Sequence, residues 1–285
     1  MHTGIGWRIV PLMDLPPTDP VAPLIRSLLA EGRPRVWSII VTVLGDAVEP
    51  HGGWIASARL SELLERVGIA PGAMRAALSR LAADGWLERE REGRASFHRL
   101  SRDRLSEYRK AARAIYAAPR AGDMQDWVLT IGVAPDARGG LLLAPGTVLW
   151  PAEAAPKKGA GLRITGKLDL SGSIPLPRQH LDARRRMRSD LAALDAFPAD
   201  LAPLDAMAAR LLLLHRWRRL VLKFPDLPAG VDPTGDTDLR RMVAVHYRRL
   251  LPASERWLAE AGPGFDALPP AATGAEPFTR FTQPA

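Results

Sequence analysis

The sequence predicts an α+β fold built from three parts, and three stretches of the chain support this. Residues 54–100 follow the order helix, short turn, helix and arginine-rich hairpin. Residues 126–177 hold strand-like runs that Gly and Pro interrupt, and helical periodicity returns over residues 179–262. The expected order is therefore a helical head with a hairpin, a small β-rich middle domain and a helical C-terminal domain.

Length and composition limit what this fold can be. The chain has 285 residues, of which 47% are hydrophobic, so it is long enough for about two domains with a buried core. It contains no cysteine, which excludes disulfides and thiolate zinc sites and fits a reducing compartment. No secretory signal opens the chain, and no apolar run reaches the roughly 20 residues of a membrane helix. We therefore expect a soluble, cytoplasmic protein that does not bind a membrane.

The head is predicted to contain two helices joined by a tight turn. Apolar residues recur at helical spacing from Leu60 to Val67, with Ser57 as the expected N-cap and Gly68 as the stop. Pro71 fits the first position of the second helix. That helix carries an apolar face and, opposite it, a face of small residues flanked by arginines. Such a face suits a helix that enters a DNA major groove about 12 Å wide.

An alternating segment around a Glu92-Gly93 turn follows and predicts a β-hairpin. Helix, turn, helix and hairpin together are the order of a winged helix-turn-helix. Residues 21–120 hold 17 Lys/Arg and 11 Asp/Glu, which is +6 of the chain's net +8. Basic charge concentrated on this motif favours a polyanion as partner.

The predicted DNA contacts are the residues that these elements turn outward. Arginine reads guanine or grips phosphate with its planar fork. The set comprises Arg75, Ser79 and Arg80 on the second helix, and Arg89, Arg91, Arg94 and Arg99 on the hairpin. Two alternatives stay open, a merely solvated helix face and local pairing of the hairpin arginines with Glu88, Glu90 or Glu92.

Composition and periodicity divide the chain into six segments. The segments are a flexible arm (residues 1–20), a winged helix DNA-binding domain (21–100), a connecting helix (101–120), a small β-rich middle domain (121–178), a helical C-terminal domain (179–262) and a disordered tail (263–285). Strands are expected over residues 126–133, 141–150 and 162–170. The connecting helix has heptad spacing, which is compatible with packing on its own domain or with a dimer contact.

Several motifs resemble those of the PaaX-type repressors of phenylacetic acid degradation, and the resemblance covers about residues 24–261. The motifs are Gly45-Asp46 with Gly52-Gly53, the pattern Arg75-x-x-Leu78-x-Arg80-Leu81-x-x-Asp84-Gly85-Trp86-Leu87, Leu143 to Gly146 with Trp150-Pro151, Leu214-His215-x-Trp217-Arg218-Arg219, Asp226-Leu227-Pro228, and His246 to Pro252. The resemblance implies a winged helix, a ferredoxin-like (Cas2-like) middle domain and a helical C-terminal domain.

The resemblance also implies a homodimer that represses aromatic catabolism genes and leaves its operator when phenylacetyl-coenzyme A binds. One departure concerns the middle domain. The family places a long helix after the first strand of that domain, whereas residues 133–140 are too few for one. We therefore expect a truncated ferredoxin-like domain.

An effector of this kind offers phosphates to arginine and an aromatic end to apolar walls. The candidates for contacting it are His215, Trp217, Arg218 and Arg219. The alternative is that Trp217 packs in the core while the arginines are surface charges.

No catalytic or metal-binding constellation stands out in the sequence. It has neither a nucleophile elbow nor a phosphate-binding loop, and its histidines lack metal-ligand spacing. We therefore predict a protein without cofactor or enzymatic activity. Together with the winged helix, the resemblance implies a repressor that binds double-stranded operator DNA and an acyl-coenzyme A effector. The alternative function is a ligand-binding or scaffold protein whose winged helix contacts another protein.

Overall fold

The fold is a mixture of helices and antiparallel sheets, as the sequence predicts. The structure is a computed structural model that describes residues 16, 18–32, 35–119, 126–132, 140–152, 155–157, 161–167, 176–224, 238–272 and 277–282. The chain divides into two units. Unit 1 comprises residues 1–110, 190–215 and 245–280, and unit 2 comprises residues 111–189, 216–244 and 281–285. Most of the predicted arm, residues 1–15 and 17, lies outside the described residues.

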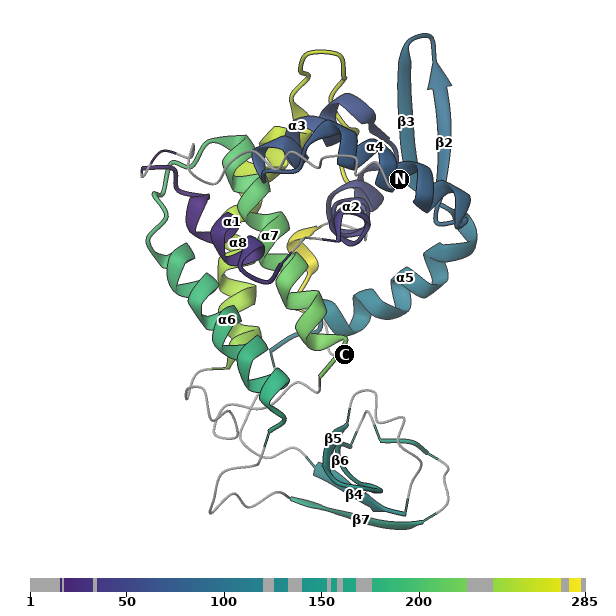
Figure 1. Cartoon of the computed structure of the whole chain (residues 1–285), viewed down its shortest axis with the longest axis vertical. Helices are drawn as coiled ribbons and strands as arrows, with labels where there is room; N and C mark the ends of the chain where they lie inside the picture. The colour runs from purple at the N-terminus through teal and green to yellow at the C-terminus, as the bar shows by residue number, and fades with distance from the viewer. Residues whose placement is uncertain are drawn as a thin grey trace, which may run out of the picture. The chain divides into compact units, whose positions relative to one another are not determined.

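Unit 1 contains the helices and hairpin of the head (Figure 1). The elements of the head are α1 (Ala22–Leu29), α2 (Val36–Val43), a π-helical turn η2 (Leu44–Val48), η3 (Glu49–His51), β1 (Ile55–Ala56), α3 (Ser57–Arg66), α4 (Pro71–Ala83), β2 (Leu87–Glu92) and β3 (Ala95–Leu100). The stripe from Leu60 to Val67 is buried, and α4 begins at Pro71 as predicted. Local periodicity therefore predicts both helices correctly.

The head carries a three-stranded antiparallel sheet of order β1-β3-β2. Glu92 pairs with Ala95, so the two-residue turn is Gly93-Arg94 rather than Glu92-Gly93. Gly93 has φ +57°, a conformation that glycine adopts without strain. The turn therefore places Arg94 at the tip of the hairpin, which extends as a long ribbon beside α4 (Figure 1).

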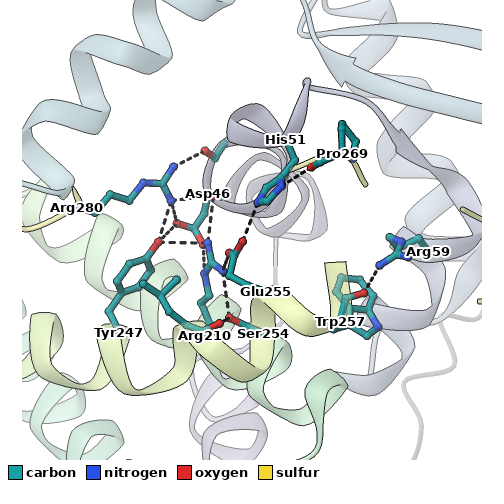
Figure 2. Close-up of polar contacts among 12 residues, drawn as sticks. Asp46, His51, Arg59, Arg210, Tyr247, Ser254, Glu255, Trp257, Pro269 and Arg280 are labelled. Carbon is teal, nitrogen blue, oxygen red and sulfur yellow. Dashed lines mark hydrogen bonds and ion pairs between the residues drawn. The ribbon is translucent and has the colours of Figure 1, made fainter. Parts of the chain in front are cut away.

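A buried ionic network joins the head to later segments of unit 1 (Figure 2). Arg210 of α7 (Pro203–Val221) is fully buried, and its Nε donates to Asp46 Oδ2 over 2.6 Å. Its Nη1 lies 2.5 Å from Glu255 Oε1, and Glu255 belongs to α8 (Leu239–Ala259). Tyr247 donates its hydroxyl to Asp46 Oδ1 over 3.0 Å, and Arg280 also forms an ion pair with Asp46. Burial would lower the pKa of Arg210, but its interactions with Asp46, Tyr247 and Glu255 together outweigh this effect and raise that pKa.

Arg59 of α3 makes a second connection in unit 1. Its guanidinium lies between the rings of Trp257 and Phe265, 4.9 and 4.3 Å from their centroids. It donates to the carbonyls of Trp257, Glu260 and Asp266, and Figure 2 shows the first of these bonds. The arginine thus satisfies carbonyl groups that the C-terminal end of α8 and the following turn leave open.

The prediction of a disordered tail is wrong for described residues 263–272 and 277–282. Leu268 and Phe281 are buried, and the backbone N–H groups of Leu268 and Ala272 donate to the carbonyls of Leu258 and Pro50 over 2.8 Å. Pro, Ala and Thr dominate the composition of this segment, which suggested disorder. A few large side chains and Arg280 suffice, because distant parts of the chain supply their partners.

Unit 2 contains a four-stranded sheet whose neighbouring strands all run antiparallel. The strands are β4 (Asp126–Ile131), β5 (Leu141–Ala144), β6 (Thr147–Pro151) and β7 (Leu162–Lys167), in the order β5-β6-β4-β7. The expected single strand over residues 141–150 is a hairpin instead. Pro145-Gly146 makes its turn, with Gly146 at φ +70°, so the turn chemistry overrides the continuous apolar pattern.

Both faces of this sheet carry buried side chains. Trp127, Leu141 and Leu149 cluster on one face with Leu176, next to α6 (Arg178–Asp195). Val128, Val148 and Trp150 cluster on the other. Within the ranges described between β4 and β7 there is no helix, and residues 133–139 of the predicted short connection lie outside those ranges.

Two absences hold for the described ranges alone. No three His, Asp or Glu side chains gather there as metal ligands would. No helix in them is long and apolar enough to cross a membrane.

Replacing Asp46 by Ala is expected to lower the free energy of unfolding by about 3–5 kcal/mol, because the fully buried Arg210 and the half-buried Arg280 would lose their shared counter-charge. Urea denaturation followed by circular dichroism measures this. Glu107→Ala is the control, since it removes the exposed pair with Arg104 and should cost less than about 1 kcal/mol. Equal losses in the two variants would contradict a central role for the buried network.

Candidate nucleic-acid interface

The outward face of α4 presents the residues that the sequence assigned to DNA. Arg75, Ser79 and Arg80 are exposed, while Met74 and Leu78 on the opposite side are buried in the head. Gly72, Ala76, Ala82 and Ala83 are exposed as well. This face is small in profile and positively charged, as a helix that enters the major groove requires.

The hairpin register separates its arginines into two groups. Arg89 lies opposite His98 and Arg91 opposite Ser96, so these two arginines share one face of the ribbon. Arg89 Nη2 donates to Ser96 Oγ over 3.0 Å. These two side chains and Arg94 at the tip are exposed to solvent.

Arg99 lies on the other face of the hairpin and is engaged there. Its Nε donates to Glu88 Oε2 over 2.8 Å, and its guanidinium stands 4.5 Å from the ring centroid of Trp54. The hydrogen bond from Arg99 lowers the pKa of Glu88. The alternative of local pairing thus describes Arg99. Across the described part of the chain, no ion pair engages Arg75, Arg80, Arg89, Arg91 or Arg94.

A groove of about 810 Å³ lies between α4, the hairpin and the start of α3. Arg75 and Ser79 line it from α4, and Arg89 and Arg94 line it from the hairpin. Four of the seven predicted DNA contacts therefore share one concave surface. Arg80, Arg91 and Arg99 do not line it.

The start of α3 is a part of this surface that the sequence did not reveal. Ala56, not Ser57, is the N-cap, and the Ser57 hydroxyl is hydrogen-bonded to His98 Nε2 at 2.9 Å. The helix has no side-chain cap and no acidic residue in its first turn. Its N-terminal N–H groups therefore favour an anion at this end of the groove. The feature of the sequence that could have indicated the Ser57–His98 contact is the alternation of β3, which turns His98 inward opposite Arg89.

Burial, with a smaller effect from Arg89, lowers the pKa of His98 from 6.5 to about 4. His98 is therefore neutral at pH 7. The positive charge of the groove comes from its arginines.

The four residues predicted to contact an effector all lie on α7. His215 is buried in unit 1, with Nδ1 3.3 Å from Thr42 Oγ1. Trp217 is 1% exposed in unit 2, and its indole N–H donates to the carbonyl of Ile115 over 2.8 Å. Arg218 is half-buried and Arg219 exposed. Trp217 thus lies where the packing alternative expects it, and the effector role stays a prediction.

Replacing His98 by Gln is expected to flatten the dependence of stability on pH. The folded-state pKa of His98, about 4, lies below the unfolded value of 6.5, so acid protonates the unfolded chain first. This contribution to stability is complete above pH 6.5 and is lost towards pH 4, by about 1.4 kcal/mol per pH unit. Urea denaturation at pH 7, 6 and 5 measures the slope. Parallel slopes for the variant and the parent protein would refute the assignment.

The family models and a known relative agree on one family. The family described as PaaX-like protein matches residues 35–104, and the PaaX-like protein C-terminal domain matches residues 178–260. The transcriptional repressor PaaX of Escherichia coli strain K12 is 29% identical over 264 residues, covering 79% of this chain and 83% of that protein.

Among solved structures, the uncharacterized protein Rv0674 from Mycobacterium tuberculosis is 22% identical, with a TM-score of 0.48 over 77% of this chain and 96% of that one. The two family matches together span more than half of the 285 residues, in the order that the sequence motifs follow. The chain belongs to the PaaX-like family.

Proposed function

We propose that this protein is a transcriptional repressor that binds operator DNA through its head. One observation carries the proposal. The arginines of α4 and of the exposed hairpin face have no ion-pair partner in the described residues, and four of the predicted contacts meet at one groove. The Escherichia coli relative is a transcriptional repressor, which supports the proposal.

In this proposal the head acts as a winged helix-turn-helix. The small, basic face of α4 enters the major groove, where Arg75 and Arg80 reach base edges or phosphates. The β2–β3 hairpin is the wing, and Arg89, Arg91 and Arg94 follow the phosphate backbone. Arg99 instead holds the base of the hairpin through Glu88 and Trp54.

We further propose that the repressor acts on aromatic (phenylacetate) catabolism genes and that an aryl-acyl-coenzyme A, such as phenylacetyl-coenzyme A, releases it. The effector would bind better to a conformation with weak DNA affinity. Because Trp217 is buried, it would take part in this response through a change in its packing rather than by contacting the effector from an exposed position. Arg218 and Arg219 lie nearer the surface and suit the phosphates of the effector.

The proposed repressor is a cytoplasmic homodimer. Two copies of α4 would then read half-sites about 34 Å apart. The sheet of unit 2 has the strand order and strand directions of a ferredoxin-like βαββαβ unit. This supports the proposal that the middle domain is a truncated ferredoxin-like domain.

The competing function is a ligand-binding or scaffold protein whose head contacts another protein. Exposed arginines without carboxylate partners favour DNA over an ordinary protein surface. Salt-sensitive binding to the DNA upstream of the protein's own gene distinguishes the two functions.

Arg75→Ala and Arg80→Ala are each expected to weaken binding to that DNA and to reduce its salt dependence. Each lost phosphate contact lowers the slope of log K against log salt by about 0.9. Fluorescence anisotropy at several salt concentrations measures both quantities. Arg185→Ala is the control, because Arg185 lies on α6 and pairs with Asp182. Unchanged affinity and slope in both head variants would refute the interface.

Phenylacetyl-coenzyme A is expected to raise the dissociation constant of the DNA complex, whereas coenzyme A or phenylacetate alone should do so less. Arg219→Ala should weaken this response without changing DNA affinity in the absence of effector, since Arg219 is exposed on α7. Anisotropy titrations with each compound provide the measurement. A full response in both Arg218→Ala and Arg219→Ala would show that the effector binds elsewhere.

A further inference from the structure

A second cavity lies in unit 1 and shares no lining residue with the DNA groove. Its volume is about 330 Å³, at the lower end of the range for small-molecule sites. Its walls are the η2–η3 segment, the end of β3 and one face of α5 (Arg102–Ile115). We propose that this cavity binds a small organic anion, a carboxylate or phosphate group carried on an apolar body.

The charge of the lining supports an anionic group. Arg102, Leu105 and Arg109 line the cavity from α5 at positions i, i+3 and i+7, which fall on one face of a helix. Arg99 adds a third guanidinium, and Glu49 is the one acidic residue in the lining. The lining therefore has a formal excess of two positive charges. The Arg102 side chain makes no hydrogen bond or ion pair to any described residue, and the Arg109–Glu49 pair is 3.2 Å long with Arg109 64% exposed.

The apolar part of the lining indicates what carries the charge. Leu44 and Leu100 are buried and Leu105 is half-buried, and all three line the same cavity as the arginines. An inorganic ion would leave this apolar wall uncovered. A ligand with an apolar body would cover it and place its anionic group among the guanidiniums.

The fold holds the two sides of the cavity in place. Tyr108 of α5 donates its hydroxyl to the carbonyl of Gly45, and its ring occupies the space that a side chain at position 45 would need. Only glycine permits this approach of α5 to the π-helical turn η2. Asp46, the next residue, lies in the buried network with Arg210. The cavity is therefore bordered by a segment that the Tyr108 contact and the buried network hold in place.

Occupation of this cavity would affect the hairpin through Arg99. Arg99 lines the cavity and also binds Glu88 near the base of β2. Glu88 Oε1 in turn accepts a hydrogen bond of 3.0 Å from the backbone N–H of Arg102, the first residue of α5. An anion that attracts the Arg99 guanidinium competes with Glu88 for it, so the hairpin base is expected to shift. That this shift changes DNA affinity rests on the proposed function.

Isothermal titration calorimetry of the full chain tests the site with benzoate and benzyl phosphate, and with benzyl alcohol as the neutral control. Both anions are expected to bind and the alcohol not. Arg102→Gln and Arg109→Gln should each weaken anion binding by at least about tenfold, the effect of one lost hydrogen bond between charged groups. Arg104→Gln, on the same helix but outside the cavity, should leave it unchanged. Glu49→Gln should strengthen binding several-fold because it frees Arg109.

Three results would overturn the proposal. The first is absence of binding by both anions to protein whose circular dichroism shows it folded. The second is equal binding of benzyl alcohol. The third is an Arg102→Gln/Arg109→Gln double variant that keeps benzoate binding but loses DNA affinity, which would assign these arginines to the duplex. The parent protein could also bind no DNA at all while the double variant loses benzoate binding. That result would support the anion site in the cavity and reject only the repressor function.

Discussion

The ion pair between Asp46 and Arg210 is the interaction on which the architecture of unit 1 depends. A buried carboxylate and guanidinium are stable only while every partner is present, since either charge alone would be costly to bury. Here the partners come from four separate segments: the η2 turn, α7, α8 and the tail residue Arg280. The described form of the head therefore includes buried polar contacts that only these C-terminal segments supply. Apolar packing is non-directional, whereas this network fixes one register between the segments.

Arg59 extends the same logic to the first helix of the two-helix motif. Its three carbonyl partners end α8 and begin the tail, so α3 is held at its start by residues about 200 positions later in the sequence. Gly264, in the turn that follows α8, lines the groove beside α4. A change in the packing of α8 or of the tail would thus reach the groove directly, without a relay through the core of the head. Such contiguity is what coupling between the proposed effector response and the proposed DNA groove requires.

The elements that the sequence predicts well are those set by local periodicity. The stripe from Leu60 to Val67, the proline at the start of α4 and the alternation of the hairpin each reflect a short-range rule. The predictions fail where distant partners decide. The described part of the tail is ordered because Leu268 and Phe281 are buried against distant parts of the chain. Ser57 does not cap α3, and its hydroxyl is hydrogen-bonded to His98 instead. The Asp46 network was equally hidden, because nothing local shows that Arg210 is fully buried rather than on a basic surface.

Net charge alone does not indicate which surface of this protein binds a polyanion, because the fold engages some arginines in internal contacts and leaves others exposed. Arg59, Arg210 and Arg99 resemble the others in sequence, yet each is held by carbonyls, carboxylates or rings of its own chain. The arginines on the outer face of α4, on β2 and at the hairpin tip lack such ion pairs within the described residues. Neutralising a phosphate with a guanidinium already bound to a carboxylate would require that bond to break, so the engaged arginines contribute little favourable energy. The arginines without such pairs bind at lower cost. Arg75, Arg89 and Arg94 lie together at one groove because the register of the hairpin and the period of α4 direct them there.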